Sequence, residues 1–193
     1  MSKRLTVGIG LAAAAGLLAL ASVAMALTII GTDGDDQIVG SPRDDSIRAL
    51  GGDDTVRALA GNDRVGAGEG DDVVAAGPGR DVVGGGPGND RIGGGPGNDR
   101  LAGGTGHDSI SGGRGDDGIA GGPGRDALSG GPGNDRIRAI DGEVDRIHCG
   151  RGRDRVAIDR VDVIVDATRR NRKGSCERVF VAAPDEDAAR RGG

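Results

Sequence analysis

The order of aliphatic and polar residues repeats every nine positions between Gly31 and Arg138, in twelve consecutive copies without an insertion. The eighth position of each copy is aliphatic, and the sixth is always Asp. The fourth position is Gly in eleven copies, and Arg43 is the exception. A strict short period of this kind is typical of a solenoid, in which each repeat stacks on its neighbours.

Each copy divides into a turn of six residues and a strand of three. In regular copies such as 85–93, the turn reads Gly-Gly-x-Gly-x-Asp. Gly permits positive φ angles, and Pro at the third position stiffens the turn. The strand reads x-aliphatic-x, so its middle side chain points inward. Two copies therefore predict one flattened coil of eighteen residues, and twelve copies predict an all-β solenoid of about six coils over 27–138.

The composition argues against an ordinary globular core. Gly accounts for 41 of 193 residues, and Phe180 is the only aromatic residue. Disorder is the main alternative, because a Gly-rich and highly charged chain buries little apolar surface. A flexible linker, however, has no need of an aliphatic residue at every eighth position. We therefore expect the chain to be largely unfolded without a ligand and to form an ordered stack when a ligand binds.

The first 26 residues have the pattern of a secretory signal peptide. Ser2-Lys3-Arg4 is basic, Leu5 to Ala21 is apolar, and Ala24-Met25-Ala26 has the small-x-small form of a cleavage site. We expect cleavage after Ala26, a secreted protein and no stable membrane span; a retained membrane anchor is the alternative. The mature chain would carry 23 basic and 30 acidic residues, a net charge of −7. Without a basic cluster interleaved with aromatics, nucleic acid is not an expected partner.

The sixth-position aspartates form two columns in such a stack. Residues eighteen apart lie on successive coils, about 4.8 Å from one another. The first column contains Asp36, Asp54, Asp72, Asp90, Asp108 and Asp126, and the second contains Asp45, Asp63, Asp81, Asp99, Asp117 and Asp135. Carboxylates at this spacing repel one another unless a cation lies between them. Oxygen ligands without thiolate or imidazole favour Ca²⁺ over Zn²⁺ or copper, so calcium is the predicted ligand of these residues.

The nine-residue pattern resembles the calcium-binding RTX repeat, the haemolysin-type nonapeptide of bacterial secreted proteins. The resemblance covers the twelve copies and implies a right-handed parallel β-roll. It also implies that the sixth-position aspartates and turn carbonyls hold Ca²⁺ between successive coils. Six aspartates at each edge leave five gaps, so we expect at most about ten sandwiched ions.

The early copies depart from this pattern. Their first two positions drift to residues such as Ser41 and Ala49-Leu50, and Arg43 requires either a strained turn or a changed one. We expect weak or absent ion sites around residues 31–66 and the best sites from Gly77 to Arg138. The fifth-position acids either add charge to the turns or are simply solvated. They are Asp35, Asp44, Asp53, Asp71 and Asp116.

Residues 139–181 predict degenerate repeats and a small β cap, with strands at 161–165 and 177–181. Asp154 is a plausible further calcium ligand, and Asp145 is a weaker one. Cys149 and Cys176 are the only cysteines, and an even number in an exported chain predicts a disulfide; two free thiols are the alternative. Residues 182–193 are small and charged and predict a flexible tail.

The sequence shows no catalytic arrangement. His107 and His148 have no neighbouring nucleophile, and no phosphate-binding loop or zinc motif is present. We expect a non-enzymatic calcium-binding protein with a structural or surface role, which folds in extracellular calcium after export. The alternative is a calcium-dependent adhesion protein that binds a cell-surface partner; an enzyme remnant is more distant. In the adhesion alternative, the candidate contact residues are Arg64, Arg91, Arg100 and Arg136. A role in solvating the surface also explains these arginines.

Overall fold

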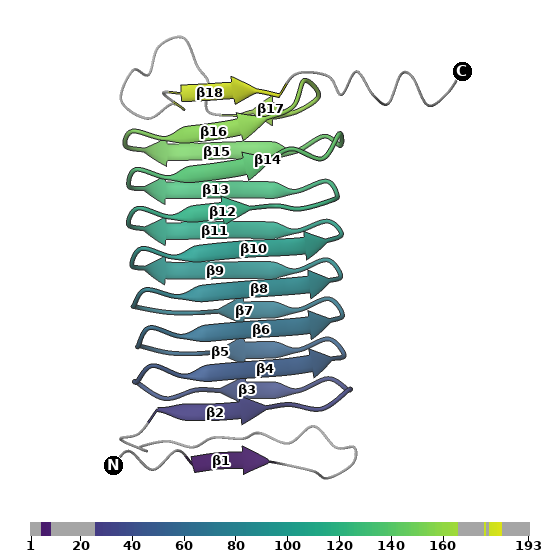
Figure 1. The fold of residues 1–193 in the computed structure, drawn as a ribbon, viewed down its shortest axis with the longest axis vertical. Helices are drawn as coiled ribbons and strands as arrows, with labels where there is room; N and C mark the ends of the chain where they lie inside the picture. Colours follow the sequence, from purple (N-terminus) through teal and green to yellow (C-terminus); the bar gives the residue numbers. More distant parts are fainter. Residues whose placement is uncertain (1–4, 9–25, 166–175, 177, 183–193) are drawn as a thin grey trace, which may run out of the picture.

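The chain forms an elongated stack of flattened coils with a strand on each of two opposite faces (Figure 1). The structure, a computed structural model, describes residues 5–8, 26–165, 176 and 178–182. Every regular element in those residues is a β-strand, and neighbouring strands within each sheet are parallel. The predicted all-β parallel β-roll is therefore confirmed.

From β2 onwards, even-numbered strands form one sheet and odd-numbered strands the other, and β1 joins the even-numbered strands. The ten-stranded sheet contains, in order, β1 (Leu5–Gly8), β2 (Leu27–Ile30), β4 (Ser46–Gly51), β6 (Arg64–Glu69), β8 (Val82–Pro87), β10 (Arg100–Thr105), β12 (Gly118–Ala120), β14 (Arg136–Ala139), β16 (Arg155–Ile158) and β18 (Arg178–Val181). The eight-stranded sheet contains β3 (Gln37–Val39), β5 (Thr55–Arg57), β7 (Val73–Ala75), β9 (Arg91–Pro96), β11 (Ser109–Arg114), β13 (Ala127–Pro132), β15 (Arg146–Arg151) and β17 (Val163–Ile164).

The eighteen-residue period sets the strand register. In the ten-stranded sheet Leu101 pairs with Val83, and in the eight-stranded sheet Ile110 pairs with Ile92. Each pair joins eighth-position residues of successive coils. Because equivalent positions stack directly, one repeat position becomes one column that runs along the whole molecule.

The interior contains two kinds of columns. The eighth-position aliphatic side chains are buried, with exposed fractions of 0–4%. The first repeat position also points inward, a feature that the sequence analysis did not anticipate. Its buried members with a side chain are Ala49, Ala58, Ala67, Ala76, Ala139, Cys149 and Ile158. The core is therefore wider than twelve aliphatic residues.

The solenoid is longer than the sequence predicted. Strands β2 to β17 make eight two-strand coils instead of six, and β18 continues the ten-stranded sheet. The ten-residue segment 139–148 is absorbed as a one-residue change of register, so that Leu128 pairs with Ile147 and Ile137 pairs with Val156. The inward aliphatic position persists through this change, which explains why the degenerate copies still stack.

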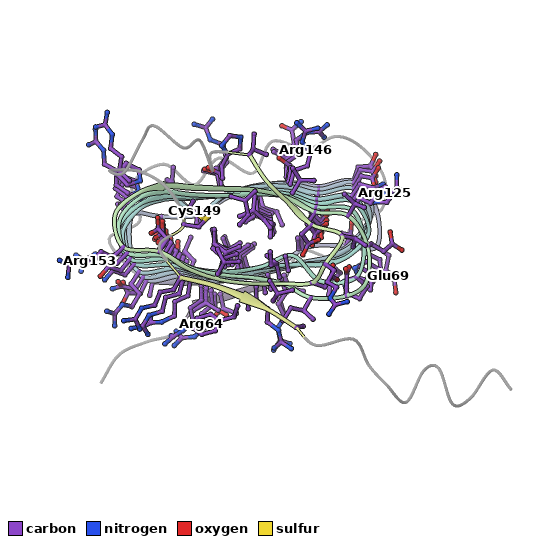
Figure 2. The ribbon with its side chains drawn as sticks, turned by 90° about the horizontal axis from the view of Figure 1, so that it is seen from above. Arg64, Glu69, Arg125, Arg146, Cys149 and Arg153 are labelled. Atoms are coloured by element: carbon purple, nitrogen blue, oxygen red, sulfur yellow. A yellow bond between two sulfur atoms is a disulfide. The ribbon has the colours of Figure 1, made fainter. Side chains whose placement is uncertain are left out.

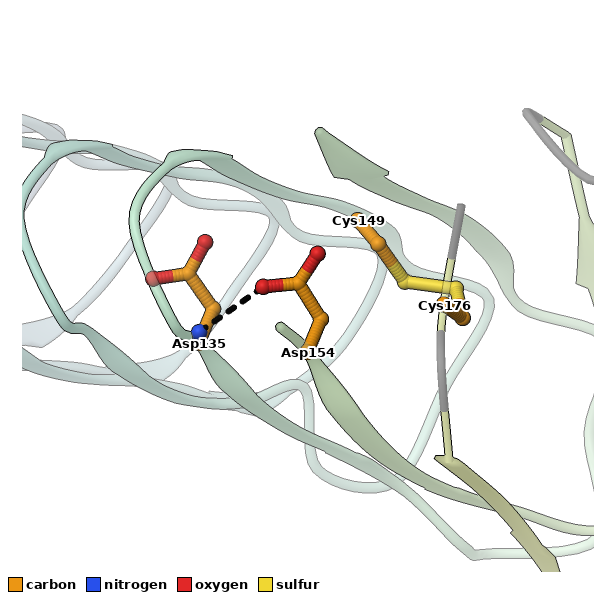
Figure 3. Close-up of a disulfide and its surroundings, with 4 residues drawn as sticks. All are labelled: Asp135, Cys149, Asp154 and Cys176. Carbon is orange, nitrogen blue, oxygen red and sulfur yellow. Dashed lines mark hydrogen bonds between the residues drawn. A yellow bond between two sulfur atoms is a disulfide. The ribbon is translucent and has the colours of Figure 1, made fainter. Parts of the chain in front are cut away.

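A disulfide joins Cys149 to Cys176, as predicted, with 5.4 Å between the two Cα atoms (Figure 3). Cys149 lies in β15 and is fully buried at the first repeat position. Cys176 precedes β18 and packs against the same core. The bond therefore ties the last coils to the strand that ends the ten-stranded sheet.

The N-terminal prediction falls mainly outside the described residues. Leu5–Gly8 forms β1 and pairs with β2, whereas 9–25 are not described. The signal peptide and the cleavage after Ala26 stay predictions, as does the flexible tail at 183–193. No helix in the described ranges is long and apolar enough to cross a membrane.

Backbone strain occurs at two leucines and not at Arg43. Among the described residues other than Gly, positive φ angles occur at Leu50 (89°) and Leu59 (82°). Both occupy the second repeat position, where later copies have Gly with a similar φ, such as Gly86. Arg43 lies outside the left-handed region, so its turn changes conformation without this strain.

We predict that Leu50→Gly raises the free energy of unfolding in saturating calcium by about 0.5–1 kcal/mol, because it removes a left-handed conformation that side chains disfavour. Little burial is lost, since Leu50 is 41% exposed. Urea unfolding followed by circular dichroism measures the change. Val73→Gly is the control: Val73 is 42% exposed, lies in β7 and has no positive φ, so its loss is expected to destabilise. Equal destabilisation by both substitutions would contradict the assignment of strain.

Candidate metal centre

Two columns of aspartate side chains lie inside the coils, one at each narrow end. Figure 2 shows carboxylate oxygens gathered at both ends of the interior when the stack is viewed along its axis. Every predicted aspartate from Asp45 to Asp135, together with Asp154, has an exposed fraction of at most 3%. Asp36, in the first copy, is partly exposed. The structure thus brings together the residues that the sequence singled out.

One oxygen of each carboxylate is fixed by the backbone. Asp72 N–H donates to Asp90 Oδ1 at 2.9 Å, and Asp81 N–H donates to Asp99 Oδ1 at 2.8 Å. The same bond joins successive coils along both columns and ends at the pair Asp135 N–H to Asp154 Oδ1, at 2.9 Å (Figure 3). These bonds hold each carboxylate plane in a defined orientation.

The second oxygen of most carboxylates is buried without a hydrogen bond. Residues with such an Oδ2 are Asp54, Asp63, Asp72, Asp81, Asp90, Asp99, Asp108, Asp117, Asp126, Asp135 and Asp145. Burying a carboxylate oxygen without a partner is costly, and such groups in a native fold need an explanation, for instance an ion. The two columns therefore present regularly spaced acceptor oxygens with no protein donor.

The first two copies differ from the rest. Asp36 Oδ2 accepts hydrogen bonds from Thr32 N–H at 2.6 Å and from its hydroxyl at 3.0 Å. Asp45 Oδ2 accepts one from Ser41 N–H at 2.6 Å, and its Oδ1 accepts others from Leu27 N–H and the Ser41 hydroxyl. Local donors thus satisfy these two carboxylates, which gives a physical reason to expect weak or absent ion sites at the start of the stack.

The first-position glycines provide space for Oδ2 in the later copies. A Cβ added at Gly85 would overlap Asp90 Oδ2 and the carbonyl oxygen of Gly103. Gly94 is crowded in the same way by Asp99 Oδ2 and the Gly112 carbonyl. A carboxylate oxygen and a main-chain carbonyl oxygen of the next coil therefore converge beside each of these glycines.

The copies between Ala49 and Gly84 lack this space. Their first position is Ala, and the buried methyl groups occupy the volume that Oδ2 takes in later copies. The structure thus contains two classes of coil. The glycine class includes the first two copies, with Gly31 and Gly40, and resumes at Gly85, eight residues after the start of the predicted best region.

Third-position prolines remove one backbone donor from the turns. In an early coil, Gly51 N–H at the third position donates to the carbonyl of Thr32 at 3.2 Å. Pro has no N–H and cannot make this bond. The second-position carbonyls that face a proline in this way are those of Leu59, Gly68, Gly77, Gly104 and Gly113. The sequence analysis took these prolines only as stiffening residues, whereas they also spare main-chain oxygens.

The buried carboxyls have raised pKa values. Burial is the main cause, neighbouring aspartates add to it, and the N–H of the preceding coil opposes it. The pKa rises to about 6 for Asp54, Asp63, Asp81, Asp90, Asp99 and Asp126, and to about 7 for Asp135 and Asp145. Without a cation, the charged form of these groups is disfavoured, and a bound cation would remove that penalty.

The fifth-position residues have a role that the sequence analysis missed. Asp35 Oδ1 accepts a hydrogen bond from Asp53 N–H, one coil later, at 2.9 Å. Asn89 Oδ1 accepts one from His107 N–H at 2.8 Å, and His107 Nδ1 accepts one from Arg125 N–H at 3.0 Å. These side chains form an outer ladder opposite in direction to that of the buried aspartates. Asp or Asn at nine of twelve fifth positions was the available signal.

Two aspartates near the C-terminal end extend one column further than expected. Asp145 is fully buried, and its Oδ1 accepts a hydrogen bond from Asp126 N–H at 2.8 Å. Asp162 Oδ1 accepts one from Asp145 N–H at 3.0 Å, and burial raises the Asp162 pKa. The altered spacing hid Asp162, although Asp162-Val163-Ile164 repeats the Asp-x-aliphatic signature of the copies.

The donor atoms are those of a hard cation site. The columns contain carboxylate and carbonyl oxygens, and Cys149, the cysteine among them, is in a disulfide. No three His, Cys, Asp or Glu side chains converge within residues 26–165, 176 and 178–182. A cation would therefore need main-chain oxygens besides the aspartates. Ca²⁺ accepts such mixed sets of six to eight oxygen ligands, so the residues fit it.

Comparison with known protein families agrees with this geometry. The family model described as an RTX calcium-binding nonapeptide repeat matches the chain four times, at residues 30–65, 67–92, 93–128 and 120–156. These matches cover more than half of the chain. No curated protein matches the chain.

We predict that acid stabilises the calcium-free fold. The buried carboxyls have pKa values of about 6 to 7 when folded, above the ordinary aspartate value of 3.8. Their protonation therefore favours the fold at low pH, and this contribution is lost as pH rises through about 4 to 7. In calcium-depleted buffer, the β-sheet signal in far-ultraviolet circular dichroism should be larger at about pH 4.5 than at about pH 7.5.

Asp135→Asn/Asp145→Asn is the matched test of this linkage, because it removes the two carboxyls with the highest of these pKa values. The variant should show a shallower pH dependence than the unmodified chain. A calcium-free β-sheet signal that grows between about pH 4.5 and 7.5 would contradict the prediction.

Proposed function

Because the chain belongs to the family of RTX calcium-binding nonapeptide repeats, we propose that its aspartate columns bind Ca²⁺ between successive coils and that these ions stabilise the β-roll. The proposed ligands are the sixth-position aspartates from Asp54 to Asp135, with Asp145 and Asp154 at the C-terminal end. First-position carbonyls such as that of Gly103 supply further oxygens. Asp36 and Asp45 are the weakest members, because Thr32 and Ser41 already satisfy them.

The unpartnered Oδ2 atoms are the observation that carries this proposal. Each belongs to a carboxylate whose Oδ1 is held by the N–H of the preceding coil, so its direction is set wherever the coils are stacked. Bound Ca²⁺ would supply the positive charge that these buried oxygens lack.

The ions would also contribute folding free energy. The interior is built from small aliphatic side chains, and many turn glycines lose more backbone entropy on folding than other residues do. Binding to the folded state alone shifts the equilibrium towards that state. The chain would remain largely unfolded in the low calcium of a cytoplasm and fold in millimolar calcium outside. This role requires the export that the N-terminal sequence predicts.

Far-ultraviolet circular dichroism of the full chain, in chelator and then in calcium, tests the proposed function. We expect β-sheet signal and a cooperative melting transition to appear with calcium at about pH 7.5. Asp90→Asn/Asp108→Asn should raise the calcium concentration at the midpoint about tenfold or more, because it removes two buried ligands of one column. Spectra and melting temperatures unaffected by calcium would refute the proposal.

The control for this experiment is Asp71→Asn. Asp71 is exposed at the fifth position, and its Oδ1 accepts the Asn89 N–H, a bond that an Asn side chain also makes. The substitution removes one negative charge near the same column without removing a buried ligand. We expect a change in the calcium midpoint of less than about twofold.

Substitutions of two adjacent glycines, Gly84 and Gly85, test whether calcium binding needs the space beside the first repeat position. Gly85→Ala should weaken calcium-induced folding about tenfold, because the added methyl group overlaps Asp90 Oδ2 and the Gly103 carbonyl. Gly84→Ala should leave the midpoint nearly unchanged, since its methyl group meets nothing within 4 Å. Calcium titrations followed by circular dichroism measure both. Indistinguishable midpoints for the two variants would show that the first-position space does not matter for binding.

A further inference from the structure

The outward face of the ten-stranded sheet carries a column of arginines at the seventh repeat position. The strand register places Arg64, Val82, Arg100, Gly118, Arg136, Arg155 and Arg178 on successive strands of that sheet. Neighbouring strands are about 4.8 Å apart, so arginines on alternate strands are about 9.6 Å apart. The column thus runs along the axis of the stack.

The turns that lead into the strands of this sheet carry two further arginines and, at the same repeat position, two aspartates, Asp44 and Asp116. Arg80 and Arg153 occupy the fifth position of these turns and are exposed. Figure 2 places Arg64 on the face of the sheet and Arg153 at the adjoining narrow end, whereas Glu69 lies towards the opposite end. We call Arg64, Arg80, Arg100, Arg136 and Arg155 the arginine row.

No carboxylate of the described residues neutralises this row. Its guanidinium groups form no ion pair or hydrogen bond with any residue that the structure describes. The outward seventh and ninth positions of the ten-stranded sheet from Ser46 to Ala157 include no acid. This is notable in a chain whose net charge is −5.

A shallow depression of about 590 Å³ lies beside the centre of the row. Arg80, Arg100 and Arg136 line it, and its floor includes Gly118 and Ala120. These small residues leave the guanidinium groups standing above the sheet. A linear ligand can therefore lie along the stack and contact several arginines at once.

Two acidic residues line the depression, Asp116 and the buried Asp99 of the aspartate column. Asp116 lines it, but its Oδ1 is engaged by the N–H and the side-chain amide of Asn134, at 2.8 and 3.0 Å. Its single charge is set against those of the three lining arginines. The depression therefore keeps an excess of positive charge.

The opposite sheet lacks this pattern. Its seventh-position column is Gln37, Thr55, Val73, Arg91, Ser109, Ala127, Arg146 and Val163. The only arginines in that column are Arg91 and Arg146, and two other residues lie between them. Solvation alone would not concentrate arginines on one face of a symmetric stack, so the asymmetry points to a ligand.

We propose that the arginine row binds a linear anionic polysaccharide that lies along the axis of the β-roll. Guanidinium groups bind carboxylate and sulfate groups through paired, charge-assisted hydrogen bonds. Nucleic acid is the less suitable polyanion, because proteins bind single strands by stacking bases on aromatic side chains. The face has no aromatic residue before Phe180, at its last strand. This surface is distinct from the buried calcium ligands, although it exists only when the chain is folded.

Binding of the full chain to chondroitin sulfate in millimolar calcium tests the proposal, measured by fluorescence anisotropy of the labelled polymer. Arg80→Gln/Arg100→Gln/Arg136→Gln should weaken binding about tenfold or more, since three charged contacts are lost. The matched control, Arg57→Gln/Arg91→Gln/Arg146→Gln, changes the net charge equally on the other sheet and should weaken binding less than about twofold. Circular dichroism in calcium verifies that both variants are folded, which separates this test from that of the calcium sites.

A short polygalacturonate distinguishes carboxylate from sulfate recognition, and neutral dextran should not bind. Three outcomes would overturn the proposal: no binding of either anionic glycan by the folded chain, equal weakening by the two triple variants, or tighter binding of oligothymidine than of either glycan. The first would show a solvated row, the second a non-specific charge effect, and the third a nucleic-acid surface.

Discussion

The half-satisfied carboxylate is the constraint on which the rest of this structure depends. In each sixth-position aspartate from Asp54 to Asp135, and in Asp145, the first oxygen accepts the backbone N–H of the preceding coil and the second oxygen is buried without a donor. The first interaction joins coils and fixes their register, whereas the second makes the stack costly to form without a cation. The same side chain is therefore both a structural link and a proposed ligand. A fold built in this way couples assembly of the coils to ion binding at each step.

The turn residues determine how much space and how many free oxygen atoms each coil offers to a cation. Gly at the first position leaves room for the free oxygen, and Pro at the third removes a donor that would otherwise engage a turn carbonyl. Early coils instead have Ala at the first position, Leu in a left-handed conformation, or a Ser or Thr that hydrogen-bonds the carboxylate. The carboxylates at the start of the stack are therefore satisfied by protein donors, whereas those of the later copies are left for the proposed ions to satisfy.

The sequence predicted the fold and the aspartate columns because both follow from period alone. Asp90 and Asp108 must stack once eighteen residues make a coil. The sequence did not show the inward first position, the outer ladder of residues such as Asn89, or the place of Asp145 in its column. The first two features depend on the direction of the backbone within the turns. The place of Asp145 depends on whether the turn before it accommodates the extra residue or the stack ends there. The coil number was underestimated for the same reason, since the inward Ile147 and Val156 continue the core after the spacing changes.

A crystal structure grown in millimolar calcium, with an anomalous difference map, tests the central claim most directly. The account predicts calcium peaks between successive coils, within about 2.3–2.6 Å of the Oδ2 atoms of Asp90, Asp99, Asp108 and Asp117. Those oxygens without a nearby peak, or hydrogen-bonded only to water or to protein donors in that crystal, would contradict it.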